Sequence, residues 1–418
     1  MSNAKTVNRT AVLVRALIIL FMCGVVNSAA VFVSPLAANY GWSTEAVAGV
    51  ATFMALMQTP GHILSGWMMG KIGPRNTLML GCVLLGLAFL LSGFVPQSSP
   101  WMLYITFSVL QGLGVGFTYT GGTYCATGWY PDKRGLASGL CMAFNGGSAT
   151  FIAPIVARLI VVMGIKVTLF IVGAAIIVIG VVAALGLKAA PEGFSPEGWE
   201  AKKEDPKLES TQLESLTPAQ AFHTRAYWHL FFGYGFFPTM YIICYPRFSV
   251  LIQEAGFGLA AATMGVSIYS ITNVVGRLAM GAVIDKIGYR KVYTICGVCS
   301  ILSSICLMFA NSLPMFYIAY ILLGIGFGAT NTCHPVAVQE TFGSKYAGGI
   351  FGICMLGYMV ICTFLSPRIS SALVNATGSW TASMIYAIVA CIIAVAVYTT
   401  IPMPHRRTLA EVEAEQEA

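Results

Sequence analysis

Charged residues are scarce in this chain. Asp, Glu, Lys and Arg make up 9% of its 418 residues, whereas a soluble domain usually has about 25%. Hydrophobic residues make up 57% of the chain, and the mean hydropathy is +0.78. The shortage of charge excludes a water-soluble globule, and the hydrophobic content excludes a disordered chain. The composition therefore predicts an all-α, polytopic membrane protein.

The cores of the long apolar segments lack acidic residues, and no metal-ligand cluster stands out in the sequence. The 12 cysteines all lie inside such segments, where a thiol behaves as a small hydrophobe, so we expect no disulfide framework. Cys296 and Cys299 form a Cys-x-x-Cys pair, but no second pair or histidine cluster stands at zinc spacing. We expect no metal and no cofactor. The sequence shows no cluster of a nucleophile, a base and an acid, so we do not expect an enzyme.

Twelve apolar segments are long enough to cross a bilayer core of about 30 Å. Their predicted ranges are 11–39, 44–69, 76–95, 100–128, 135–163, 166–188, 226–250, 258–284, 290–310, 313–339, 346–373 and 379–401. The intervening residues 189–225 carry seven acidic residues and several prolines, which is typical of a linker. We therefore predict a six-helix half (1–188), a cytoplasmic linker (189–225) and a second six-helix half with a short tail (226–418).

The cations are distributed unevenly between the two predicted membrane faces. With the N-terminus in the cytoplasm, 18 of the 23 Lys and Arg residues fall on the cytoplasmic side. The others are Arg158, Lys166, Arg247, Arg277 and Arg368. This bias predicts a protein of the cell inner membrane with both termini in the cytoplasm. Topology thus accounts for the net charge of +7, and we expect a monomer in the lipid bilayer with no nucleic-acid partner.

Two pairs of motifs recur at nearly the same spacing. GWMMGKIGPR at 66–75 corresponds to GAVIDKIGYR at 281–290, an offset of 215 (281 minus 66). The glycine runs at 112–116 and 324–328 correspond at an offset of 212 (324 minus 112). Two independent matches at nearly one offset indicate a six-plus-six duplication.

Both ten-residue motifs resemble the GxxxDrxGrr loop signature of the major facilitator superfamily, and the resemblance covers the whole chain. WYPDKRGLASG at 129–139 and NVVGR at 273–277 resemble, more narrowly, its monocarboxylate porter and oxalate/formate antiporter branch. The resemblance implies two halves related by a parallel pseudo-two-fold repeat, with substrate bound between them near the membrane midplane.

The resemblance also implies a gating role for the two loops, whose candidate residues are Gly66, Lys71, Arg75, Asp285, Lys286 and Arg290. Gly70 stands where the second loop has Asp285, so we expect the charged contacts of the two loops to differ. The alternative is that both loops are plain turns whose cations extend to the membrane surface.

Arg277 is the strongest candidate for binding a substrate. It lies eight residues before Asp285, or about 12 Å into the membrane at about 1.5 Å per residue. A cation at that depth usually faces water or an anion, and its planar guanidinium matches a carboxylate. An internal ion pair is the alternative, but no predicted helix core contains Asp or Glu. Asn273, one turn earlier on the same face, replaces the Asp that the resemblance to animal monocarboxylate porters implies.

Two histidines are candidates for proton coupling because histidine titrates near pH 7. His62 is the repeat counterpart of Arg277, since 62 plus 215 is 277, and it follows Pro60-Gly61. His334 precedes Pro335. Either histidine can instead be a packing residue, in which case the substrate itself carries the proton. Further candidates for substrate contact, each with packing as the alternative, are Tyr119, Asn331, Tyr358, Cys362, Asn27 and Phe32.

The sequence thus predicts a twelve-helix secondary transporter that moves a small monocarboxylate, such as lactate or pyruvate, together with a proton. One central cation favours a monoanion. An oxalate/formate-type antiporter is the alternative, because the resemblance implies a second cation in the eleventh helix, which here reads GICMLGY at 352–358. A membrane sensor of the same fold is a more remote alternative, since no long soluble signalling domain is present.

Overall fold

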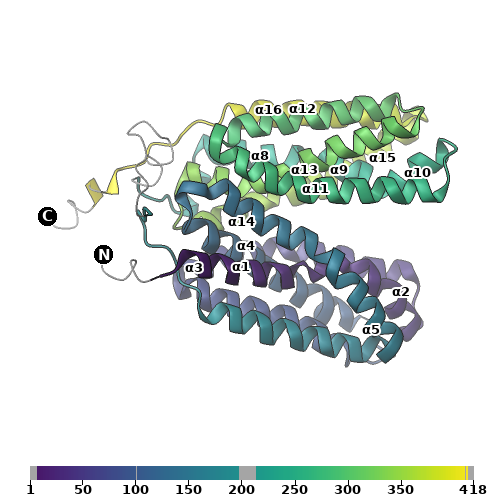
Figure 1. Cartoon of the computed structure of the whole chain (residues 1–418), viewed down its shortest axis with the longest axis horizontal. Coiled ribbons are helices and arrows are strands. Elements are labelled where there is room, and N and C mark those ends of the chain that lie inside the picture. The colour runs from purple at the N-terminus through teal and green to yellow at the C-terminus, as the bar shows by residue number, and fades with distance from the viewer. Residues whose placement is uncertain (1–6, 100, 197–212, 410, 413–418) are drawn as a thin grey trace.

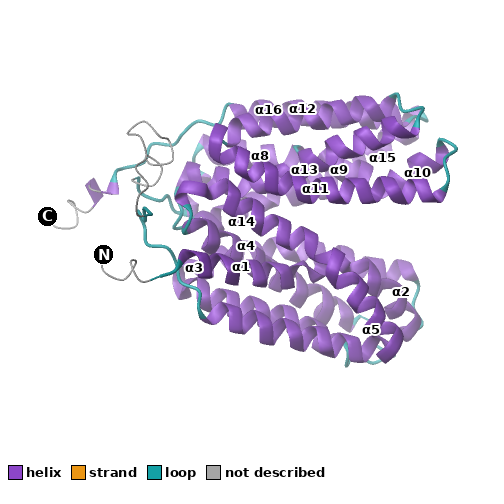
Figure 2. Ribbon diagram, viewed as in Figure 1, coloured by secondary structure: helices purple, strands orange, loops and turns teal. Residues whose placement is uncertain are grey.

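The computed structural model describes residues 7–99, 101–196, 213–409 and 411–412. Within these ranges the chain is all-α, and Figure 2 shows helices joined by short loops. The first part contains α1 (Arg9–Cys23), η1 (Gly24–Ser28), α2 (Ala29–Tyr40), α3 (Thr44–Ser92), η2 (Tyr104–Val109), α4 (Leu110–Gly128), η3 (Pro131–Lys133) and α5 (Arg134–Leu185).

The second part begins after the residues of the predicted linker. It contains α7 (Pro218–Phe222), α8 (Arg225–Phe236), α9 (Thr239–Cys244), η4 (Tyr245–Arg247), α10 (Phe248–Glu254), α11 (Leu259–Ile287), α12 (Tyr289–Met308), α13 (Leu313–Phe342), α14 (Ala347–Gly357), η5 (Tyr358–Leu365), α15 (Ser366–Thr377) and α16 (Trp380–Thr399).

Two of the long helices are each divided by one glycine. Gly73 in α3 has a φ of +76°, and Gly164 in α5 has a φ of +79°. Only glycine adopts this conformation readily, so each residue turns the chain sharply between two helical stretches. The loops predicted at 70–75 and 164–165 are therefore tighter than expected, each reduced to a kink.

The described residues contain eight helices long and apolar enough to cross a membrane, or nine if the bent pair 225–244 and 248–254 is one span. The chain is therefore a multi-pass membrane protein. α3 and α5 each count once here despite their glycine kinks. The count of twelve and the pseudo-two-fold axis stay predictions.

Four predicted helices are interrupted. The range 226–250 breaks at Pro238 and again at the 3₁₀ turn η4, because proline donates no backbone hydrogen bond. The range 11–39 contains the 3₁₀ turn η1, where a Cβ on Gly24 would overlap Ser148 of α5. The ranges 100–128 and 346–373 contain the wider π-helical turns η2 and η5. Such interruptions are frequent at functional sites.

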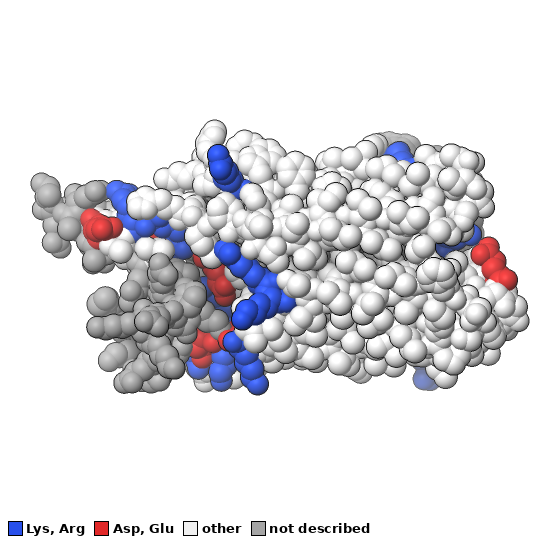
Figure 3. Space-filling model, turned by 90° about the horizontal axis from the view of Figure 1, so that it is seen from above, with Lys and Arg blue, Asp and Glu red and all other residues white. Residues whose placement is uncertain are grey.

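The helices gather in two bundles. Figure 1 shows α1 to α5 in one bundle and α8, α11, α12 and α16 in the other, with both termini at the same end. On the face shown in Figure 3, Lys and Arg gather at that end and a wide uncharged zone follows. This is the charge pattern of a membrane-spanning domain.

The bundles touch at the end that carries the termini, through small residues. Gly66 of α3 lies against Gly348 and Gly349 of α14, and Gly135 of α5 lies against Gly281 of α11. A Cβ at these glycines would overlap the opposite backbone, so glycine permits the close approach. Toward the opposite end the bundles diverge (Figure 1).

The described part of the predicted linker includes a short helix that the sequence analysis did not anticipate. α7 begins with Pro218 and is held by a reciprocal cap, in which Thr217 and Gln220 each bind the other's backbone N–H. Residues 197–212 of the linker lie outside the described part of the chain. Near its end, the backbone N–H of Glu214 donates to Arg407 O at 2.7 Å, which joins the linker to the C-terminal segment.

Candidate functional site

Arg277 reaches from one bundle to the other. It lies on α11, and its Nη1 donates to the carbonyl oxygen of Met142 on α5 at 2.5 Å. Its Nε is buried without a hydrogen-bond partner among the described residues. A guanidinium carries five N–H donors, so this arrangement leaves donors for an anion at the junction of the bundles.

Glycines on α5 make room for Arg277. A Cβ on Gly146 would overlap its guanidinium, and one on Gly139 would lie 2.5 Å from its carbonyl oxygen. A Cβ on Gly147, by contrast, would make only ordinary contact with Val274, at 3.7 Å. The position of the guanidinium therefore depends on glycine at 146, a requirement that the sequence analysis missed.

Tyr119 lies beside Arg277 because both contact Met142. The Tyr119 hydroxyl donates to Met142 Sδ at 2.8 Å, while the carbonyl of the same methionine binds the arginine. The positive charge of Arg277 also acts on the hydroxyls of Tyr119, Tyr241 and Tyr269. These hydroxyls can donate to a carboxylate bound at the arginine.

Three aromatic side chains pack together in the bundle that carries Arg277: Tyr241, Tyr269 and Phe327. Tyr241 of α9 stacks on Phe327 of α13 with ring centroids 3.8 Å apart, and it lies 5.7 Å from the ring of Tyr269. Asn273 is buried and donates to the Tyr269 hydroxyl at 3.4 Å, one helical turn from Arg277. The sequence analysis missed Tyr241. Pro238, three residues before Tyr241, is the feature of the sequence from which a break in the helix, and so this residue, could have been recognised.

His62 of α3 is buried where α3 meets α4 and α14. Its Nδ1 lies 2.7 Å from Thr120 Oγ1, and its ring meets those of Tyr119 and Phe351 edge-on. Its exposed fraction is 2%. The structure thus places His62 beside Tyr119, and its contact with a substrate stays a prediction.

His334, Asn331 and Tyr358 gather around a residue that the sequence analysis missed, Tyr234 of α8. The rings of Tyr234 and His334 stack at 3.9 Å, and Tyr358 lies 5.4 Å from Tyr234. The Tyr234 hydroxyl donates to Asn331 Oδ1 at 3.1 Å, and His334 Nδ1 lies 3.1 Å from the Tyr398 hydroxyl. His334 Nε2 has no partner within the described ranges.

The remaining predicted substrate contacts are Asn27, Phe32 and Cys362. Asn27 donates to Asn145 O at 2.9 Å, directly before the glycine that accommodates Arg277. Phe32 packs between Phe89 and Phe107, and it and Cys362 are fully buried. In this conformation the structure brings Asn27 near Arg277 and places Phe32 in the apolar core of the first bundle.

The two gating loops make different contacts. The Asp285 carboxylate accepts hydrogen bonds from Gly135 N at 2.9 Å and Leu136 N at 2.8 Å, in the first turn of α5. Lys71 lies over the Trp67 ring at 3.9 Å, and Arg290 donates to Ile401 O at 2.6 Å. Arg75 and Lys286 are exposed, while Gly66 is packed against α14.

Metal ligands do not cluster in the described residues, since no group of three or more His, Cys, Asp or Glu side chains is placed to hold an ion. The residues around Arg277 supply hydrogen-bond donors, aromatic rings and one positive charge. The arrangement can thus bind a small anion between two bundles.

Comparison with known proteins identifies a family for nearly the whole chain. The family model described as Major Facilitator Superfamily matches residues 16–266 and, in a second match, 230–417. YhjX, an uncharacterized MFS-type transporter of Escherichia coli (strain K12), is 26% identical over 349 residues, which cover 83% of this chain and 84% of that protein. The oxalate:formate antiporter of Oxalobacter formigenes is 27% identical over 352 residues, which cover 80% and 78%. Monocarboxylate transporter 12 of Rattus norvegicus is 25% identical over 366 residues, which cover 82% and 74%.

Solved structures show the same fold. The proton:xylose symporter XylE matches with a TM-score of 0.73 and 13% identity, covering 97% of this chain and 98% of that one. The transporter FucP in the outward conformation matches with a TM-score of 0.72 and 12% identity, covering 94% and 99%.

Proposed function

The chain belongs to the Major Facilitator Superfamily, whose members similar to it are transporters, and from this premise we propose that it carries small monocarboxylates across the inner membrane. Transport proceeds by alternating access, with the two bundles rocking about a substrate site between them. The substrate is a monoanion of lactate or pyruvate type, moved together with a proton.

The position of the Arg277 guanidinium is the observation that supports this proposal best. Its guanidinium lies at the junction of the bundles, bonds α5 through Met142, and keeps a buried Nε without a partner among the described residues. One carboxylate neutralises one guanidinium and pairs with it through two parallel hydrogen bonds. The hydroxyls of Tyr119, Tyr241 and Tyr269 feel the same charge and supply further donors.

The bundles touch at the end that carries the termini, which we call the closed end. This contact supports an assignment of the side of the membrane to which the substrate site opens. With the termini in the cytoplasm, as the bias of the cations predicts, the glycine contacts close the cytoplasmic side. The structure then corresponds to an outward-facing state, in which an anion reaches Arg277 from outside. Opening to the inside requires that the contacts of Gly66, Gly135 and Asp285 separate.

Two routes for the proton remain open in the proposal. In the first, His62 or His334 takes it up. In the second, the carboxylate is protonated at the site and leaves as a neutral acid. The second route agrees better with the buried hydrogen bonds of both imidazoles, to Thr120 and to Tyr398.

Oxalate/formate exchange is the second candidate, and similarity to the oxalate:formate antiporter of Oxalobacter formigenes favours it. Against it, residues 347–365 of α14 and η5 include no Lys or Arg, so a dianion meets a single central cation. The second carboxylate would lose its hydration without a partner.

Uptake into proteoliposomes tests the proposal. The purified protein is reconstituted, and labelled lactate, pyruvate, acetate, formate and oxalate are offered with and without an inward proton gradient. We expect gradient-driven accumulation of the monocarboxylates of two to three carbons. Accumulation of none of them, or oxalate uptake that needs formate inside, would contradict the proposed substrate class.

A further inference from the structure

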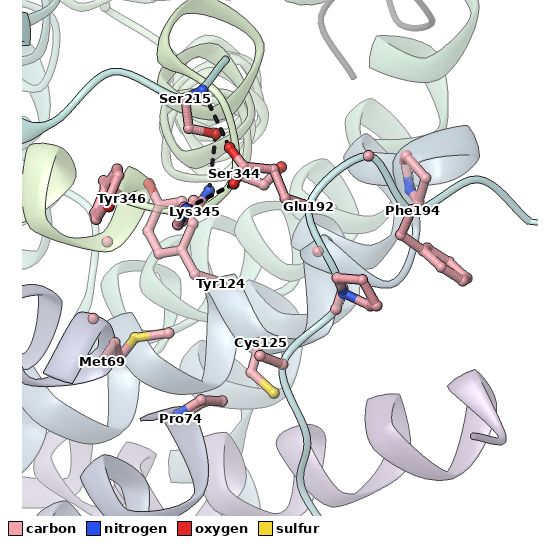
Figure 4. Close-up of a pocket in the computed structure, with 18 of the residues that line it drawn as sticks. Met69, Pro74, Tyr124, Cys125, Glu192, Phe194, Ser215, Ser344, Lys345 and Tyr346 are labelled. Atoms are coloured by element: carbon pink, nitrogen blue, oxygen red, sulfur yellow. Dashed lines mark hydrogen bonds and ion pairs between the residues drawn. The ribbon is translucent and has the colours of Figure 1, made fainter. Parts of the chain in front are cut away.

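A cavity of about 440 Å³ lies at the closed end, away from Arg277. Its walls come from both bundles and from the start of the linker (Figure 4). Its lining includes Gly70, Tyr124, Arg134, Glu192, Lys345 and Gly348. The cavity therefore lies where the bundles must separate during transport.

The bundles also meet where α11 lies against α5, and that contact shows which chemical group can join them. There Asp285 of α11 accepts hydrogen bonds from Gly135 N and Leu136 N, two of the first backbone N–H groups of α5. These groups have no partner inside the helix, and the helix dipole favours a negative charge beside them. A carboxylate thus joins the second bundle to the first helix turn of α5.

The corresponding place on α14 has no carboxylate of its own. Gly70 is the counterpart of Asp285 at the offset of 215, and Gly348 follows Gly135 by 213 (348 minus 135). No side chain of the described residues caps α14, which has eleven residues. A Cβ on Gly70 would find its nearest neighbour, Tyr346 Cε1, at 4.0 Å, so the space before α14 is open.

In the described part of the chain, the hydroxyl of Tyr124 lacks a hydrogen-bond partner in the cavity, independently of the end of α14. Tyr124 lines the cavity and is 5% exposed. Figure 4 shows Tyr124 extending from α4 toward Lys345 and Tyr346. A buried hydroxyl without a partner is unfavourable, and a bound oxygen atom would satisfy it.

The charged residues in the cavity lining are Arg134, Glu192 and Lys345. Arg134 donates to Ser344 Oγ at 3.3 Å, and Lys345 Nζ forms an ion pair with Glu192 Oε2 at 2.9 Å. The Glu192 carboxylate raises the pKa of Lys345 above its ordinary value, so the lysine stays charged. Arg134 also interacts electrostatically with Glu340 and Asp285, so the preference for an anion comes from the first turn of α14 and from the Tyr124 hydroxyl.

We propose that this cavity binds a small oxyanion, a carboxylate or inorganic phosphate, between Gly70 and the first turn of α14, with the Tyr124 hydroxyl donating to it. The anion takes the role on α14 that Asp285 has on α5. It connects the two bundles at their closed end and stabilises this conformation. The site is separate from the one at Arg277.

Thermal unfolding of the purified full-length protein in detergent tests the site, with inorganic phosphate as the probe and sodium chloride at matched ionic strength as the reference. We expect phosphate to raise the apparent Tm saturably, by about 2 °C or more. Tyr124→Phe should raise the half-saturating concentration several-fold. Gly70→Asp should abolish the response, because its carboxylate occupies the site. Tyr293→Phe is the matched control, since this buried hydroxyl also has no partner among the described residues but lies outside the cavity lining.

Two further measurements identify the ligand and the site responsible for the rise in Tm. Acetate in place of phosphate shows whether carboxylates share the site. Arg277→Gln should keep the phosphate response, since the central site is not involved. The proposal is overturned if the wild type does not respond to phosphate, if Tyr124→Phe and Gly70→Asp respond as the wild type does, or if only Arg277→Gln abolishes the response.

Discussion

The guanidinium of Arg277 lies directly against the backbone of Gly146, across the interface between the two bundles. Any larger residue at 146 displaces the guanidinium, because a Cβ there overlaps Nη1. Since α5 and α11 move relative to each other during alternating access, this contact couples the position of the charge to the state of the transporter. The binding site is thus formed by a cation from one bundle and a space left by the other.

Gly146→Ala should therefore impair transport strongly while the protein still folds. We expect the affinity for substrate to fall about tenfold or more, because the arginine loses its place beside Met142. Uptake kinetics in proteoliposomes and thermal unfolding measure the two effects. Gly147→Ala is the matched control, since its Cβ makes ordinary contact with Val274. Equal losses in both variants would show that α5 tolerates no added volume, and would refute a specific role for Gly146.

Arg277→Lys should reduce transport by at least about two orders of magnitude at unchanged expression. Lysine keeps the charge but loses the planar pair of donors that a carboxylate binds. Uptake of labelled lactate or pyruvate under a proton gradient is the measurement. Normal uptake by the lysine variant would mean that the arginine acts as a point charge alone.

Monocarboxylates of two to four carbons should compete for transport better than oxalate. One guanidinium neutralises one carboxylate, and the second carboxylate of oxalate must lose water without an opposite charge. Competition by unlabelled acids at fixed pH gives their relative affinities. Tighter binding of oxalate than of lactate would select the oxalate/formate alternative.

Replacing His62 and His334 by Gln should leave gradient-driven accumulation in place. Both imidazoles are buried with hydrogen-bond partners, and we expect the substrate to carry the proton. Accumulation ratios of each single variant and of the double variant decide between the routes. Loss of accumulation with retained exchange of substrate, in any of these variants, would assign the coupling to that histidine.

Asp285→Asn should weaken the closed end. The carboxylate caps the first turn of α5, and a charged cap of this kind contributes about 1 kcal/mol. We expect a lower Tm and greater reactivity of cysteines introduced beside Gly135 toward a cytoplasmic thiol reagent. Glu254→Gln is the control, because its ion pair with Arg247 is exposed at the opposite end. Reactivity equal to that of the wild type would exclude a closing role for Asp285.

Much of the fold followed from local patterns in the sequence. Long apolar segments must form helices in a bilayer, because every backbone polar group there needs a partner within the segment. The spacing of the two related motifs, 66–75 and 281–290, indicated the duplication, and the depth of Arg277 indicated a functional cation. The interruptions at Pro238, η1 and η5 did not follow, because they depend on neighbours from other helices.

Composition, membrane depth and repeat spacing were enough to identify the class of protein, the central arginine and the glycine that replaces an acid at position 70. The partners of these residues depend on how the helices pack. Packing of α11 on α5 brought Arg277 to Met142 and Gly146, and burial placed His62 against Thr120 and not beside the arginine. Such contacts join residues more than 50 positions apart, and no local pattern in the chain specifies which of the many possible helix faces will meet.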